Sequence, residues 1–176
     1  MYIILLMLFT VVAGFYIVHR IDQQRWDRYQ FDRAKFFLLN PYYFYSNHTF
    51  EISIYMNAFT QTKLVNALML NPNNSIIYKN VTIQRFSGQQ INQYEIKVII
   101  ENIAVGYLEK NYAKQFVRCL EHTDFFVGRP IEVFAEISLV DRHGKSGCIV
   151  KLDLCSDPFL AKDYVFEKKA GTKHIK

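Results

Sequence analysis

The stretch "YEIKVIIENIAVGYLEKNYAKQF", residues 94–116, contains the succession of elements that decides the fold. An apolar run over residues 96–100 breaks at Glu101-Asn102 and resumes over residues 103–108, a pattern typical of two strands joined by a tight turn. After the second strand the pattern becomes polar, with apolar residues at helical spacing. Gly106 is expected where a side chain would crowd a neighbouring element. The stretch therefore predicts a β-hairpin followed by a helix that packs on the sheet.

The residues on both sides of this stretch predict further strands and one more helix. Apolar and polar residues alternate over residues 50–56, which is typical of a half-buried strand. Strands are also expected over 76–86, 129–140 and 145–154, and helices over 58–70 and 109–122. The predicted fold class is α+β: a small curled sheet or partial β-barrel of about five strands with two short helices.

Composition and charge narrow the class of protein. Of the 176 residues, 51% are hydrophobic and 21% are charged, as in a globular chain. The net charge of +5 comes from the two ends of the chain, because residues 41–160 carry equal numbers of basic and acidic groups. The three cysteines and five histidines lack the spacing of a disulfide framework or a zinc site, and no cofactor is expected. No nucleophile–base, P-loop or metalloprotease motif is present, so we expect no catalytic residues and a protein that is not an enzyme.

The first 18 residues, "MYIILLMLFTVVAGFYIV", carry no charge. A run of this length predicts a transmembrane anchor over residues 1–19. Five basic residues follow within residues 20–35, so by the positive-inside bias the rest of the chain faces the cytoplasm. The expected location is the inner membrane, with a single pass and a cytoplasmic C-terminal domain. A buried helix in a soluble protein is the alternative.

The remaining organisation follows from helix and charge patterns. Residues 20–40 are expected to continue as a juxtamembrane helix, whose arginines contact anionic lipid or simply lie in solvent. Asn40-Pro41 should end that helix. A folded domain is predicted over 41–160 and a basic tail over 161–176.

Four groups of residues follow one another in and around the opening stretch: Asn92-Gln93-Tyr94-Glu95, residues 96–100, Val105-Gly106-Tyr107-Leu108 and Ala113. In this order they resemble the HIRAN domain family, in its bacterial form. The residues "YMNAFTQTKLVNAL" and "CIVKLDL" are similar to the entry into the first helix and to the last strand of that family. The resemblance covers roughly residues 50–155. The family's loop aspartate is Glu95 here, and the loop is shorter than in the family.

The resemblance implies a function in binding nucleic acid, namely the 3′ ends of single-stranded DNA. Tyr94 and Tyr107 would stack on unpaired bases, and Glu95 would accept a hydrogen bond from a terminal hydroxyl. Tyr55 and Phe59 are the nearest counterparts of the family's residues after the first strand. Candidate phosphate contacts, chosen by proximity in sequence, are Lys110, Arg85 and Lys97. The alternative is a membrane-tethered scaffold that binds a protein partner and no nucleic acid.

Overall fold

The computed structural model describes residues 2–70, 75–85, 94–142 and 145–167. Its contacts divide the chain into two compact units, Met1–Leu39 and Asn40–Lys176. The first unit is one helix, α1 (Tyr2–Leu39), so the expected anchor and the expected juxtamembrane helix are a single element. It ends before Asn40-Pro41, as predicted, because a proline disfavours helical backbone in the residue before it. No helix among the described residues combines the length and the apolarity that crossing a membrane requires.

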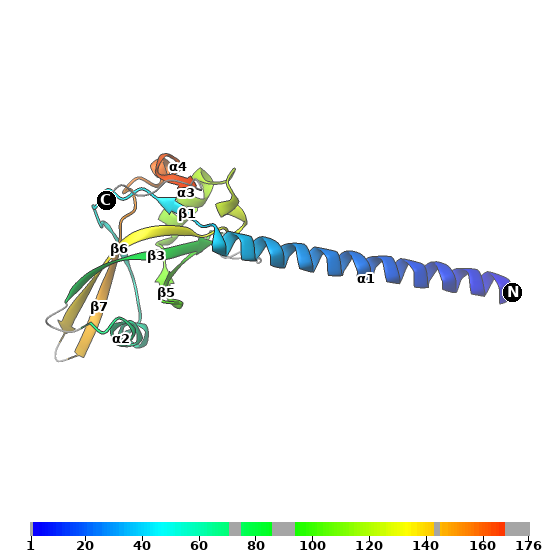
Figure 1. The fold of residues 1–176 in the computed structure, drawn as a ribbon, viewed down its shortest axis with the longest axis horizontal. Coiled ribbons are helices and arrows are strands. Elements are labelled where there is room, and N and C mark those ends of the chain that lie inside the picture. The colour runs from blue at the N-terminus through cyan, green and yellow to red at the C-terminus, as the bar shows by residue number, and fades with distance from the viewer. Residues whose placement is uncertain (1, 71–74, 86–93, 143–144, 168–176) are drawn as a thin grey trace. The chain divides into compact units, whose positions relative to one another are not determined.

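The second unit is an α+β domain built on a curled sheet (Figure 1), which confirms the predicted class at this level. Its strands run in the order β2-β7-β6-β3-β4-β5, and β1 pairs with both β6 and β8. The strands are β1 (Tyr42–Phe44), β2 (Ile52–Ile54), β3 (Ile76–Arg85), β4 (Ile96–Ile100), β5 (Ile103–Tyr107), β6 (Ile131–Arg142), β7 (Lys145–Leu152) and β8 (Val165–Glu167). The helices are α2 (Ala58–Ala67), α3 (Lys110–Cys119) and α4 (Ala161–Tyr164), with short 3₁₀ turns η2 (Asp124–Val127) and η3 (Pro158–Leu160).

The predicted hairpin forms between β4 and β5, followed directly by α3. Its two turn residues, Glu101 and Asn102, have φ angles of 47° and 61°. Left-handed backbone at both central positions is the geometry that joins two twisted strands through two residues. The carboxylate of Glu109 then accepts hydrogen bonds from the backbone N–H groups of Asn111 and Tyr112, at 3.0 and 2.9 Å, and so caps the start of α3. These bonds hold the pKa of Glu109 below its ordinary value.

Gly106 lies where β5 approaches the end of β2, as predicted. A Cβ atom on Gly106 would lie 2.7 Å from the backbone oxygen of Tyr55 and 2.8 Å from the Ile54 side chain. No Cβ tolerates such a distance, so the absence of a side chain lets the two ends of the strand order come together. The sheet can therefore curl around its core.

The core lies on the inner face of the curled sheet. Alternate residues of the central strands are fully buried there, including Ile83, Val98 and Ile137. Helix α3 adds Phe116 and Val117, which are also fully buried. Because the side chains of a strand alternate between faces, the residues between these positions point outward and form the surface on which a site can be built.

The folded domain extends beyond the predicted boundary at residue 160. Residues 161–167, expected to begin a basic tail, form α4 and β8, and β8 pairs antiparallel with β1. Neither β1 nor β8 was predicted, so the domain has more strands than the sequence indicated. Residues 168–176, the remainder of the expected tail, and Asn92-Gln93 of the resemblance motif lie outside the described residues.

Candidate functional site

A row of basic side chains follows the exposed side of α3. Lys110, Lys114 and Arg118 are spaced four residues apart and are all exposed, whereas Ala113 and Phe116 between them are buried. Residues four apart are neighbours on a helix surface, and like charges at that spacing destabilise the helix by a few tenths of a kcal/mol per pair. No ion pair joins any of the three to another described residue.

Tyr94 lies beside this row. The Nζ atom of Lys114 is 6.0 Å from the centre of the Tyr94 ring, and the ring is half-buried against the core. Arg85 is close by: burial lowers its pKa, and the nearby Tyr94 partly offsets that effect. The Arg85 guanidinium lies over the Phe126 ring at 4.1 Å and donates to the Phe126 carbonyl. We name Tyr94, Lys110, Lys114 and Arg118 the basic face.

The other predicted site residues do not join this face by any described ring contact. Tyr107 is half-exposed and pairs across the hairpin with Lys97. Glu95 is exposed at the start of β4. Tyr55 and Phe59 are 90% and 79% exposed, at the end of β2 and the start of α2. The structure therefore places Tyr94 and Lys110 along one surface, and Glu95 directly follows Tyr94 in the chain. No ring contact among the described residues joins Tyr107, Tyr55 or Phe59 to this surface.

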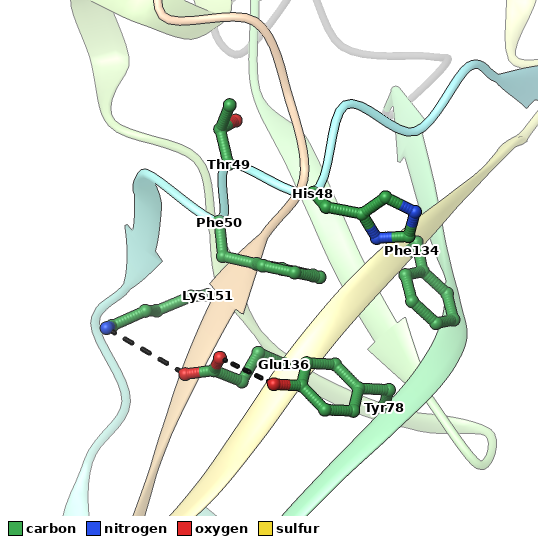
Figure 2. Close-up of a pocket in the computed structure, with 7 residues that line it drawn as sticks. All are labelled: His48, Thr49, Phe50, Tyr78, Phe134, Glu136 and Lys151. Atoms are coloured by element: carbon green, nitrogen blue, oxygen red, sulfur yellow. Dashed lines mark hydrogen bonds and ion pairs between the residues drawn. The ribbon is translucent and has the colours of Figure 1, made fainter.

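A second surface, which we name the aromatic groove, lies on the outer face of the sheet (Figure 2). It is open, measures about 580 Å³, and is lined by His48, Thr49, Phe50, Tyr78, Phe134, Glu136 and Lys151. Tyr78 and Phe134 come from the neighbouring strands β3 and β6, and their rings stack with centres 6.0 Å apart. The Phe50 ring lies tilted against both rings, with centre distances of 5.4 Å to Tyr78 and 6.0 Å to Phe134. His48 meets the Phe134 ring edge-on at 5.8 Å.

The loop that carries His48 and Phe50 has an unusual backbone. These two residues have φ angles of 57° and 47°. Bulky residues rarely adopt left-handed backbone, which costs of order 1–3 kcal/mol each unless the surroundings hold it. Such backbone outliers are concentrated at functional sites, so the conformation marks this loop as a candidate part of a binding site.

A buried carboxylate holds this loop in place. Asp153, only 1% exposed, accepts hydrogen bonds from the backbone N–H groups of His48 at 2.9 Å and Thr49 at 3.0 Å, and from the Ser46 hydroxyl. Its own N–H donates to the Phe134 carbonyl at 2.8 Å, which ties the loop to β6. Burial alone would raise the pKa of Asp153, but the hydrogen bonds outweigh burial and the pKa lies below its ordinary value.

The polar end of the groove is formed by three side chains from neighbouring strands. The Glu136 carboxylate lies between the Tyr78 hydroxyl, 3.3 Å away, and the Lys151 ammonium, 3.8 Å away (Figure 2). The side chain of Glu136 is only 20% exposed, whereas that of Lys151 is 42% exposed. The groove thus combines aromatic surface with one carboxylate and one partly exposed cation.

The aromatic groove was not predicted from the sequence, although the sequence contains a signal for it. The outward-facing residues of β6 include Glu132, Phe134 and Glu136. Because Phe134 lies between two acidic residues on the outer face, its ring is not part of the core and is available for a surface site. Pairing of Tyr78 with Glu136 could not be read from the sequence, because it depends on strand register. Lys114 and Arg118 of the basic face were also not predicted, although they follow Lys110 at four and eight residues, which is the spacing of one helix face.

Neither surface resembles a metal centre. Within the described residues, no group of three histidine, cysteine or acidic side chains could hold a metal ion. Cys148 and Cys155 are buried, and burial raises the pKa of the Cys148 thiol to about 11. What the two surfaces offer is charge, aromatic stacking and hydrogen bonding.

Comparison with known proteins adds no relative: no family model, no curated protein and no solved structure matches this chain.

Proposed function

We propose that the domain of residues 40–167 is a binding module for single-stranded nucleic acid, with the basic face as its contact surface. The observation that carries this proposal is the row Lys110, Lys114 and Arg118 beside the ring of Tyr94. A row of like charges costs helix stability, and phosphate groups spaced along a strand would relieve that repulsion. An unpaired base can stack on a tyrosine, which contributes about 1–3 kcal/mol per base.

The test is fluorescence anisotropy of a labelled single-stranded oligonucleotide with the full chain, over a range of salt concentrations. The double variant Lys110→Gln/Lys114→Gln should bind more weakly, and its plot of log affinity against log salt should flatten by about 0.7 per lost phosphate contact. The matched control is Lys63→Gln/Lys162→Gln, which removes the same charge from exposed lysines on α2 and α4. Equal losses of affinity in the two double variants would show that only the net charge matters, and would refute the basic face as the contact surface.

The resemblance to the HIRAN family directs a second arm of this test to 3′ ends. Blocking the 3′ hydroxyl of the oligonucleotide should weaken binding if the exposed Glu95 accepts a hydrogen bond from it. Tyr94→Leu should weaken binding while it keeps the apolar packing of this half-buried residue. Binding that is indifferent to the blocked end would remove end recognition but leave the basic face in place.

The second candidate function is a scaffold that binds a protein partner. It is favoured by Tyr55 and Phe59, two large side chains that are exposed on the folded domain four residues apart in the chain. Aromatic residues are enriched at the centres of protein interfaces. No binding of the oligonucleotide at low salt, where phosphate attraction is strongest, would favour this candidate.

We further propose that residues 1–19 tether the chain to a membrane. The support is that this part of α1 carries no charged residue before Arg20 and holds large exposed apolar side chains, including Phe9, Val11 and Phe15. Exposed apolar surface of this extent is unfavourable in water. The full chain should stay with membranes after alkaline extraction, whereas a chain that starts at Arg20 should be released. Release of both would refute the tether.

A further inference from the structure

The aromatic groove contains a carboxylate whose polar contacts to other described residues are long. The Glu136 side chain is only 20% exposed, yet its two polar contacts, with the Tyr78 hydroxyl and the Lys151 ammonium, are 3.3 Å and 3.8 Å long. A charge-assisted hydrogen bond between nitrogen and a carboxylate is about 2.7–2.9 Å long. Lys151 therefore neutralises Glu136 only loosely, from a side chain that is the more exposed of the two.

The rings beside this carboxylate attract positive charge. Phe50, Tyr78 and Phe134 have ring centres within 6.0 Å of one another, and Tyr78 is 55% exposed. The face of an aromatic ring carries partial negative charge and binds cations that lie over it. A loosely paired carboxylate and an aromatic surface on the same groove thus favour the same chemistry in a ligand.

We propose that the aromatic groove binds an arginine side chain of a partner polypeptide. The planar guanidinium stacks on the exposed Tyr78 ring and donates two hydrogen bonds to Glu136, replacing the loose contact with Lys151. A guanidinium fits better than an ammonium, because it offers a flat face to the ring and a fork of donors to the carboxylate. The groove volume of about 580 Å³ leaves room for the backbone that carries the arginine. The proposal is independent of nucleic-acid binding.

The loop conformation supports this assignment, since it places ring surface next to the carboxylate. Phe50 contacts Tyr78 from a loop whose backbone is left-handed at His48 and Phe50, and Asp153 holds this loop through hydrogen bonds from the N–H groups of His48 and Thr49. A strained backbone held by a buried group is expected where the position of a side chain matters for binding.

The test uses the full chain and the peptide Gly-Ser-Gly-Arg-Gly-Ser-Gly, with lysine and glutamine versions of the same peptide as controls. Binding is measured by saturation-transfer NMR. The arginine peptide should bind about tenfold more tightly than the glutamine peptide, and Glu136→Gln should remove that difference. Lys151→Met should strengthen binding of the arginine peptide severalfold, because it removes the internal competitor.

Two outcomes would overturn the proposal. Equal binding of the arginine and glutamine peptides would show that the carboxylate plays no part. Weaker binding of the arginine peptide by Lys151→Met, together with binding of adenosine or guanosine monophosphate, would assign the groove to a nucleotide instead. Unchanged thermal unfolding of Glu136→Gln and Lys151→Met, both on the outer face of the sheet, serves as the folding control.

Discussion

Among single residues, Asp153 is predicted to be important for stability, because one buried carboxylate accepts hydrogen bonds from several donors of the loop before β2. Asp153→Asn keeps the shape but replaces one acceptor oxygen with a donor, so at least one backbone N–H loses its partner. We expect a loss of about 2 kcal/mol in the free energy of unfolding, measured by urea denaturation. Asp157→Asn is the matched control: Asp157 caps an exposed turn at Phe159, and asparagine caps equally well. Similar losses in both variants would contradict the role assigned to Asp153.

The same residue predicts a pH dependence. The folded-state pKa of Asp153 is depressed, so its contribution to stability is fully present above the ordinary aspartate pKa of about 3.9. The contribution is lost as the pH falls from there through the folded-state pKa. The stability difference between the native chain and Asp153→Asn should therefore be constant near neutral pH and shrink below about pH 4. A stability difference that grows as the pH falls would show that folding does not lower the pKa of Asp153.

Gly106 makes a steric prediction at the point where β5 meets β2. In Gly106→Ala the new methyl group would meet backbone at 2.7 Å, and backbone cannot move cheaply, so we expect a loss of about 1–3 kcal/mol. Gly147→Ala is the control, because its new methyl group would meet mainly the flexible end of the Gln61 side chain. Thermal unfolding should separate the two variants clearly. An unchanged melting temperature in Gly106→Ala would mean that the sheet does not curl tightly here.

Elements whose contacts are local could be predicted from the sequence. The β4–β5 hairpin and α3 were predicted because an apolar run, a two-residue break and helical spacing are all local signals. Strands β1 and β8 have three residues each, which is too few for alternation to be recognised. Their pairing is also distant in sequence: β1 pairs with residues of β6 more than 80 positions away and with residues of β8 more than 100 positions away. The aromatic groove takes residues from four separate segments, so only the register of the folded sheet could reveal it.

The turn of the β4–β5 hairpin carries a residue that suits its conformation poorly. Glu101 has a φ of 47°, and asparagine adopts left-handed backbone more readily than glutamate. We expect Glu101→Asn to stabilise the domain by about 0.5 kcal/mol in thermal unfolding. The variant also removes the exposed ion pair between Glu101 and Lys79, which contributes little. Lys79→Gln removes only the ion pair, so its effect on stability can be subtracted from that of Glu101→Asn. If Glu101→Asn still destabilises the domain after this subtraction, the backbone at Glu101 is not strained.

At the scale of the whole molecule, the two ends of the folded domain meet through Arg129. This residue is 6% exposed; its Nε donates to the Asn40 carbonyl at 2.7 Å, and its Nη1 lies 2.6 Å from the Glu167 carboxylate. Its guanidinium also lies 4.0 Å from the centre of the Tyr42 ring. One buried cation therefore joins the entry into β1 and the end of β8, segments at opposite ends of the domain sequence.

This arrangement predicts that residues 161–167 are needed for stability. A chain that ends at Leu160 loses β8, the fully buried Ala161 and the Glu167 carboxylate, and leaves Arg129 with only the 3.3 Å contact to Asp124 as an ion pair among the described residues. We expect it to lose about 3 kcal/mol or more in urea denaturation, because a buried cation deprived of its partner is costly. A chain that ends at Glu167 keeps every contact described here and is the control. Arg129→Met should be less damaging than the truncation, since it removes the charge that would be left unpaired. Equal stability of the two shortened chains would mean that β8 does not contribute to the stability of the domain, which would then end near residue 160.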